Sequence, residues 1–195
     1  MSADVSNPFA IFEEWFAAAK KAEADLPEAM SVATASKDGK VTSRMVLLKS
    51  FDASGFVFFT NTGSRKAADI AENSQVALLF HWKSQSRQVR ITGAAQFVDD
   101  AEADAYFATR PRGAQIGAWA SRQSGAMEGL FSLEKEVAKF TAKFGAGKIP
   151  RPPFWTGYRI VPDGFEFWEE GRFRLHRRRS FTPNSDGWST EWLYP

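Results

Sequence analysis

The chain has 195 residues, of which 44% are hydrophobic, and we expect a single domain over residues 1–195 with one sizeable core. It has no cysteine, which excludes disulfides, iron–sulfur clusters and cysteine nucleophiles, and no segment approaches the roughly 20 apolar residues of a membrane span. We therefore expect a soluble, cytoplasmic protein that binds no membrane, and the net charge of +2 is too small to favour a nucleic-acid binder.

The N-terminal part is predicted to form a helix followed by an antiparallel meander. The helix is expected from Pro8 to about Ala24, because an Asn-Pro pair begins it and aromatic residues follow at helical spacing. Residues 30–59 then show strand patterns separated by turn residues at 37–40 and 52–55. Three antiparallel strands are expected there.

A short basic helix is predicted next. Ser64 is placed to cap a helix from Arg65 to Glu72, which puts Arg65 and Lys66 in its first turn. Cations at that end oppose the helix dipole unless an anion rests on the free amide groups. A phosphate site and a solvated basic turn explain these residues about equally well.

The remaining elements predict a mainly β (α+β) fold. Strands are expected at Gln75–His81, Arg87–Phe97, Trp155–Val161, Phe165–Trp168, Arg172–Arg178 and Trp188–Leu193, with helices at Asp99–Ala108 and Leu130–Phe144. No repeat of fixed period is present. A closed or nearly closed β-barrel of about eight antiparallel strands, with peripheral helices, is the economical arrangement.

Cations flank several predicted elements. The stretch 44–49 is apolar between Arg44 at one end and Lys49 at the other. Cations in such positions usually face solvent or bind a ligand anion. The full set of phosphate-competent positions is Arg44, Lys49, Arg65, Lys66, Arg110 and Arg178. Because one phosphate dianion typically needs two or three cations, the set fits two phosphorylated ligands, a cofactor and a substrate.

Other chemistry has little support. The two histidines, His81 and His176, do not have metal-ligand spacing, and no Gly-x-Ser-x-Gly motif marks a hydrolase. We therefore expect no metal.

From about Phe9 to Pro195 the chain resembles the pyridoxine (pyridoxamine) 5′-phosphate oxidase family, a group of FMN-binding split β-barrels. The resemblance rests on many short blocks in order along the chain. These blocks are residues 44–49, 58–61, 63–66, 87–89, 106–107, 110–112, 115–119, 167–168 and 174–176.

The resemblance implies FMN as the cofactor. It assigns the FMN phosphate to Arg44, Arg65 and Lys66, and the flavin to Met45, Val46, Leu47, Leu48, Lys49, Phe59, Thr60 and Gln88. It further implies that Gln123, Ser124, Trp168 and Arg178 reach the same flavin from the other subunit. A homodimer with FMN sites at the subunit interface is therefore expected.

The resemblance also implies the substrate and the reaction. Lys49, Tyr106 and Arg110 would bind the substrate phosphate, and Arg174 and His176 would surround the pyridine ring as the catalytic residues. The enzyme would oxidise pyridoxine or pyridoxamine 5′-phosphate to pyridoxal 5′-phosphate. Hydride would pass to FMN, and O2 would reoxidise the flavin and give hydrogen peroxide.

Three departures from the family pattern concern the substrate side. Ala114 stands where a serine is usual, Arg177 where an aspartate is usual, and the chain begins almost at its first helix. The missing hydroxyl predicts weaker substrate binding with FMN retained. Two alternatives stay open: a split-barrel enzyme that uses FMN on another small molecule, and a non-catalytic carrier of FMN or pyridoxal 5′-phosphate.

Overall fold

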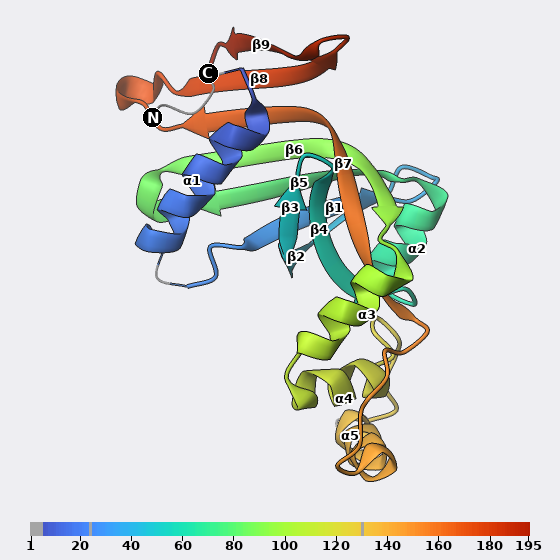
Figure 1. Cartoon of the computed structure of the whole chain (residues 1–195). Coiled ribbons are helices and arrows are strands. Elements are labelled where there is room, and N and C mark those ends of the chain that lie inside the picture. Colours follow the sequence, from blue (N-terminus) through green and yellow to red (C-terminus); the bar gives the residue numbers. More distant parts are fainter. Residues whose placement is uncertain (1–5, 24, 130) are drawn as a thin grey trace.

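The computed structural model describes residues 6–23, 25–129 and 131–195. Within these residues nine strands form one antiparallel sheet that curls into a split barrel, which confirms the predicted mainly β class (Figure 1). The strand order is β2-β1-β5-β6-β7-β4-β3, with β8 paired to β7 and β9 paired to β8. The strands are β1 (Ala29–Ala35), β2 (Val41–Leu47), β3 (Ser50–Asp52), β4 (Gly55–Asn61), β5 (Gln75–Trp82), β6 (Arg87–Phe97), β7 (Trp155–Glu169), β8 (Arg177–Asn184) and β9 (Gly187–Leu193).

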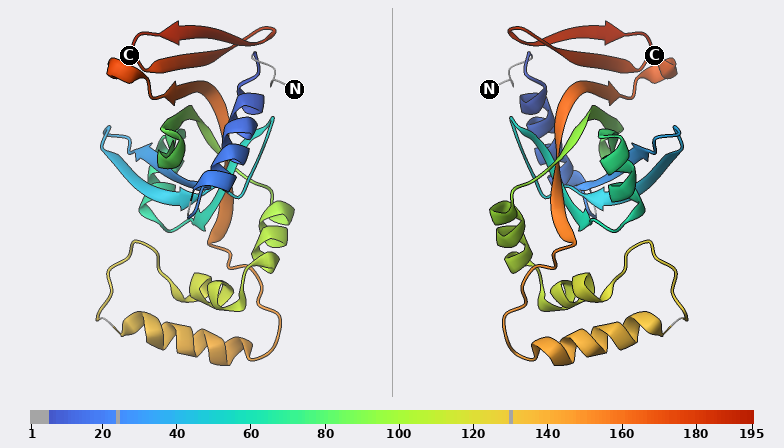
Figure 2. Two further views of the ribbon diagram at one scale, coloured as in Figure 1. Left: turned by 90° about the vertical axis from the view of Figure 1, so that its left-hand side faces the viewer. Right: turned by 90° about the vertical axis from the view of Figure 1, so that its right-hand side faces the viewer.

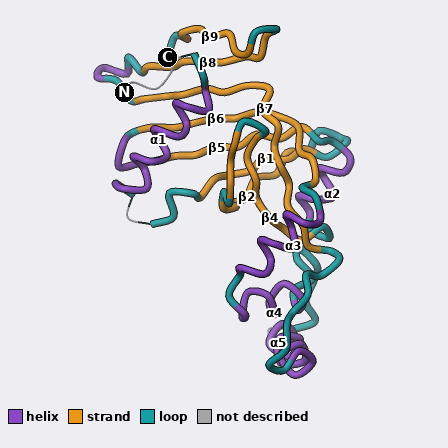
Figure 3. Tube along the Cα trace, viewed as in Figure 1, coloured by secondary structure: helices purple, strands orange, loops and turns teal. Residues whose placement is uncertain are grey.

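The helices lie at two places around this sheet. Helix α1 crosses the sheet, whereas α4 and α5 lie at the opposite end of the molecule from β8 and β9 (Figures 1 and 2). Figure 3 shows that helices and loops alone make up this end beyond α3. The helices are α1 (Pro8–Ala22), α2 (Arg65–Glu72), α3 (Asp100–Thr109), α4 (Arg112–Ala120) and α5 (Ser132–Phe144). None in the described part of the chain is long and apolar enough to span a membrane.

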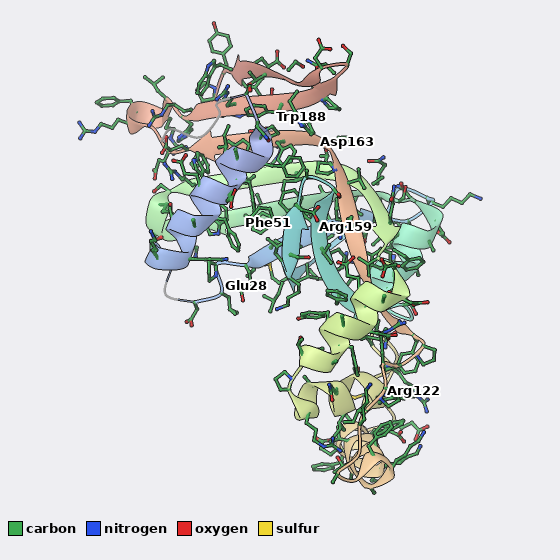
Figure 4. All side chains as sticks on the ribbon, viewed as in Figure 1. Glu28, Phe51, Arg122, Arg159, Asp163 and Trp188 are labelled. Carbon is green, nitrogen blue, oxygen red and sulfur yellow. The ribbon has the colours of Figure 1, made fainter. Side chains whose placement is uncertain are left out.

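Helix α1 closes an aromatic core. Its first turn is capped by Asn7, whose side-chain oxygen accepts a hydrogen bond from the backbone N–H of Phe9 at 2.9 Å. Phe12 is fully buried, with its ring centroid 4.8–5.0 Å from those of Phe51, Phe56 and Phe80. Trp188 of β9 packs edge-on against Phe9, which ties the C-terminal hairpin to the same core (Figure 4). The predicted helix end at Ala24 and helix start at Leu130 lie outside the described residues.

Strand β7 joins the two parts of the sheet. It runs without a break through Pro162-Asp163-Gly164, where two strands were predicted, so that prediction is wrong. Its first half pairs with β4 and its second half with β8, while β6 accompanies both halves. A register shift at Thr92/Gly93 bends the pair, and a Cβ on Gly93 would lie 2.2 Å from a β7 carbonyl oxygen. The turn-like residues therefore mark a bend in one strand.

Three further predictions need correction. Residues 29–61 contain four strands, because the short β3 forms a hairpin with β4. Helix α4 was not predicted, since Pro111 and two glycines in this stretch resemble a loop. The expected strand Arg172–Arg178 is instead a 3-10 turn at Arg172–Arg174, and β8 begins only at Arg177.

Candidate active site

A cavity of about 600 Å³ lies between β2, β4 and the helices α3 and α4. Most of the predicted site residues meet there. Those that line it are Arg44, Met45, Val46, Leu47, Lys49, Phe59, Thr60, Lys66, Tyr106, Arg110 and Gln123; Leu48 is buried beside them without lining it. Segments from distant parts of the sequence thus form one pocket.

Lys66 places a buried positive charge in this cavity. The residue is only 7% exposed, and its Nζ donates to Thr60 Oγ1 at 3.1 Å, Ser64 Oγ at 3.2 Å and Gln123 Oε1 at 3.0 Å. All three acceptors are neutral, and no carboxylate of the described residues forms an ion pair with Lys66. Burial, and then the charge of Arg44, lower the pKa of Lys66. An anion in the cavity would restore its preference for the charged form.

Ser64 occupies the predicted N-cap position of α2 but does not cap the helix through its side chain. Its hydroxyl accepts the hydrogen bond from Lys66 instead. The expected cap is therefore present in backbone conformation only, because the buried ammonium group competes for the serine oxygen.

Arg44 reaches the same cavity from β2. Its Nη1 donates to the carbonyl of Val32 at 3.2 Å and to Thr34 Oγ1 at 2.8 Å, and its Nη2 donates to Thr42 Oγ1. The closest carboxylate, that of Asp69, lies 4.0 Å from Nη2. Burial lowers the pKa of Arg44, although Asp69 opposes this. The guanidinium is thus fixed on its protein side.

Arg65 behaves differently from the other predicted phosphate ligands. Its Nε pairs with Asp69 Oδ1 at 2.9 Å, and its side chain lines a neighbouring hollow with Lys40 and Glu72 rather than the cavity. Its backbone N–H donates to Ser124 Oγ at 3.3 Å. The structure therefore brings Arg65 next to the cavity but not into its wall.

Arg110 is a half-buried cation that forms no ion pair with a carboxylate of the described residues. It follows the last turn of α3, and its guanidinium lies 4.8 Å from the ring centroid of Trp155. Its Nη1 is buried and has no hydrogen-bond partner among the described residues, and burial lowers the pKa of the guanidinium. Beside it, Phe59 stacks on Tyr106 at 4.1 Å and on Trp155 at 5.2 Å. An aromatic wall thus flanks an unsatisfied donor.

Gln123 and Ser124 contact residues of their own chain. Gln123 Oε1 accepts from both Thr60 and Lys66, and Ser124 accepts from Arg65. That both residues also reach the flavin of the other subunit stays a prediction. The loop after α4 is long enough to fold back onto β4 within one chain.

A second group of predicted residues gathers away from the cavity. Gln88 of β6, Trp168 of β7 and Arg178 of β8 are direct neighbours in the sheet register. They line a smaller hollow of about 270 Å³ together with Glu166, Arg90 and Pro195. Arg178 Nε pairs with Glu166 at 2.8 Å, and its Nη1 donates to the carbonyl of Tyr194 at 2.8 Å.

Arg174 and His176 lie at the turn beside this second group. A Cβ on Gly171 would lie 1.9 Å from a backbone oxygen of the turn, and both Phe173 (φ 57°) and Arg174 (φ 63°) adopt left-handed conformations. The His176 ring lies 4.7 Å from that of Trp168, and Phe173 is 92% exposed. Neither Arg174 nor His176 lines the 600 Å³ cavity of its own chain.

Several cavity residues were not predicted. Asn61, Ser121 and Trp155 line it, and the Asn61 amide donates to the carbonyl of Ser121 at 3.1 Å. Asp69, buried behind Arg44, was also missed. The signal for Asp69 was its position four residues after Arg65, where the two side chains meet on one helix face.

Comparison with known proteins identifies the family. The profile described as "Pyridoxamine 5′-phosphate oxidase" matches residues 16–144, and that described as "Pyridoxine 5′-phosphate oxidase C-terminal dimerisation region" matches residues 155–195. A protein of Brucella canis named pyridoxine/pyridoxamine 5′-phosphate oxidase is 53% identical over 192 residues, which cover 97% of this chain and 95% of the relative.

Two solved structures share the fold of this chain. PhzG from Burkholderia lata, in complex with tetrahydrophenazine-1-carboxylic acid, is 31% identical with a TM-score of 0.93, covering 98% of this chain and 94% of PhzG. An FMN-binding protein from Nostoc punctiforme related to pyridoxamine 5′-phosphate oxidase shares the fold at 16% identity, with a TM-score of 0.76 and coverage of 96% and 98%. From the matched profiles and the close relatives, the chain belongs to the pyridoxamine 5′-phosphate oxidase family.

Proposed function

We propose that this protein is an FMN-dependent oxidase that converts pyridoxine or pyridoxamine 5′-phosphate to pyridoxal 5′-phosphate. The observation that carries the proposal is the pair of cations, buried Lys66 and half-buried Arg110, that line one cavity without a carboxylate partner among the described residues. Two anions, one at each cation, would satisfy this cavity. The name shared by relatives 53% identical to the chain favours FMN and a phosphorylated pyridine as these two ligands.

The FMN phosphate fits the side of the cavity formed by β2, β4 and α2. Arg44 and Lys66 supply the charge, and Thr60 and Gln123 supply polar groups next to Lys66. The stretch Met45–Leu47 and Phe59 offers apolar surface for a flavin. Arg65 would complete the phosphate contacts through its backbone or after leaving Asp69.

The substrate phosphate fits the side formed by α3 and α4. Arg110, Lys49 and Tyr106 line this side, and the buried Nη1 of Arg110 has no hydrogen-bond partner among the described residues. The stacked rings of Tyr106, Phe59 and Trp155 limit the space beside it. Ala114 also lines this side and offers no hydroxyl, so it contributes no hydrogen bond to a phosphate.

A homodimer would complete the site. Trp168, Arg174, His176 and Arg178 lie outside the cavity of their own chain, on the segment that matches the family's dimerisation region. We therefore place these residues of one subunit at the cavity of its partner. Arg174 would cover the substrate ring and His176 would hydrogen-bond its ring hydroxyl, which holds the reacting carbon in position.

When bound, FMN would accept hydride from the substrate C4′ carbon and pass the electrons to O2, which leaves as hydrogen peroxide. The chain's own residues bind and orient the two ligands. Lys66 and Arg110 fix the two phosphates, and the aromatic wall and Arg174 exclude water from the reacting faces. Arg178 donates hydrogen bonds near the flavin.

The test is aerobic turnover of the FMN-loaded protein. With pyridoxine or pyridoxamine 5′-phosphate we expect equal amounts of pyridoxal 5′-phosphate and peroxide. Binding of both ligands without peroxide would identify a carrier. Peroxide formation only with an unrelated small molecule would identify a split-barrel oxidase of another substrate, and either result overturns the proposal.

A further inference from the structure

Arg44 lies next to a buried carboxylate, that of Asp69, at a distance of 4.0 Å, without a direct hydrogen bond to it. Asp69 of α2 is 3% exposed, and its Oδ2 accepts hydrogen bonds from Thr34 Oγ1 at 2.7 Å and Thr42 Oγ1 at 3.0 Å. The same two hydroxyl oxygens accept hydrogen bonds from the Arg44 guanidinium. Thr34 and Thr42, which are paired across β1 and β2, thus connect Asp69 to Arg44 through hydrogen bonds.

The direction of these hydrogen bonds is fixed by chemistry. A hydroxyl carries one proton, and an ionised carboxylate can only accept. Each threonine hydroxyl therefore donates its hydrogen bond to Asp69, and the lone pairs of both hydroxyl oxygens face Arg44. The other carboxylate oxygen is occupied by Arg65 Nε at 2.9 Å.

Asp69 stays ionised in this position. Burial alone would raise the pKa of its carboxyl group, but the hydrogen bonds from Thr34, Arg65 and Thr42 together lower it. An asparagine could not reproduce the arrangement, because its NH2 group must face either the threonines or Arg65. Toward Arg65 it would place a donor against a donor, and toward the threonines it would donate to their oxygens, which would then no longer direct their protons away from Arg44.

We propose that Asp69 is a positioning residue that aims the Arg44 guanidinium into the cavity through Thr34 and Thr42. The inference rests on the proposed function, since it takes the FMN phosphate as the anion that Arg44 receives. Removing the carboxylate would also remove a negative charge near the phosphate, which favours binding. The loss of orientation outweighs that gain, because the threonine hydroxyls would no longer hold their lone pairs toward Arg44, and only the Val32 carbonyl would remain a fixed acceptor.

The experiment measures affinity for FMN and for riboflavin, which lacks the phosphate, by quenching of flavin fluorescence. For Asp69→Asn we expect FMN affinity to fall about tenfold with riboflavin affinity unchanged. In an Arg44→Ala background the same substitution should change FMN affinity little, because the two act as one unit. Asp52→Asn, which removes a carboxylate paired with Arg159 at the β3–β4 hairpin, is the matched control and should leave both affinities unchanged.

Three results would overturn the inference. Unchanged or tighter FMN binding by Asp69→Asn would show that charge outweighs orientation. Equal losses for FMN and riboflavin would show a merely structural role. Equal affinity of the wild-type protein for FMN and riboflavin would show that the cavity binds no flavin phosphate, which would also contradict the proposed function. If Asp69→Asn does not fold, Thr42→Val decides the matter: about threefold weaker FMN binding with unchanged riboflavin binding supports the inference, and no change contradicts it.

Discussion

The cavity and the C-terminal cluster, which we define as Gln88, Arg90, Glu166, Trp168 and Arg178, both contain cations, but carboxylates lie closer to the cations of the cluster. In the cluster, Glu166 pairs with Arg178 at 2.8 Å and with Arg90 at 3.1 Å. In the cavity, Lys66 has neutral partners only and Arg110 has a free Nη1. Desolvation destabilises a buried charge without a counterion by several kcal/mol, unless a ligand supplies the counterion. The contrast therefore distinguishes the cavity cations, which we propose bind ligand anions, from the cluster cations, which pair with carboxylates of the protein.

This contrast refines the role of Arg178. Its hydrogen bond to Glu166, which also pairs with Arg90, raises the pKa of the guanidinium and holds it beside a carboxylate. Arg178 would then act on the flavin as an oriented hydrogen-bond donor more than as a positive charge. Arg177 also has a carboxylate partner, Glu169, at 2.7 Å.

The largest expected effect is that of Arg174→Ala. Because Arg174 contacts only the substrate in the proposed site, flavin reduction should slow by about 100-fold while FMN affinity is unchanged. Anaerobic stopped-flow absorbance and an FMN titration measure the two quantities. An equally large loss of FMN affinity would contradict the assignment of Arg174 to the substrate alone.

Lys66→Ala should weaken FMN binding about 30-fold, because a buried hydrogen bond from a charged group contributes about 2 kcal/mol. Fluorescence titration measures it. Lys139→Ala on α5, where the lysine pairs with Glu136 on an exposed helix face, is the control and should have no effect. FMN binding that is insensitive to Lys66 would contradict the account of the uncompensated charge.

Arg110→Ala should raise KM for pyridoxine 5′-phosphate about tenfold and leave FMN affinity unchanged. Steady-state kinetics with FMN in excess give the KM. Should Arg110→Ala weaken FMN instead, the two ends of the cavity have been assigned the wrong way round.

FMN affinity should also depend on alkaline pH. The pKa of Lys66 lies below its usual value in the free protein, and a bound phosphate favours the charged form. As the pH rises through that lowered pKa, binding must take up a proton, so affinity should fall by up to tenfold per pH unit. Titrations at successive pH values test this, and Lys66→Arg, which stays charged, should flatten the profile.

The smallest effect is expected for Ala114→Ser. A new hydroxyl next to the substrate phosphate should lower KM about threefold, from a neutral hydrogen bond of roughly 0.5–1 kcal/mol. The measurement is KM at fixed FMN. No change would indicate that residue 114 does not face the phosphate.

Local patterns predicted most of the fold. Alternation and turn residues located the strands from Met30 to Phe97, and the cations flanking β2 pointed to the cavity. The turn at Arg172–Arg174 was missed because its residues alternate like a strand, whereas its left-handed backbone depends on the close contact at Gly171. Long-range packing decides such a segment.

The site was predicted to receive Trp168 and Arg178 from the other subunit, but Arg174 and His176 were not separated from the cavity residues. Sequence resemblance joined Arg174 and His176 to Arg110 in one list, yet a single chain holds them in different regions. The role of Asp69 was invisible for a related reason. Its partners, Thr34 and Thr42, come from strands that meet α2 only in the folded molecule.

The most direct test of the central claim is anaerobic reduction of the bound flavin. The FMN-loaded protein is mixed with pyridoxine 5′-phosphate without oxygen, and flavin absorbance is followed over time. The account predicts bleaching, with recovery of the yellow colour when air is admitted. Persistent colour with both pyridoxine and pyridoxamine 5′-phosphate would contradict it.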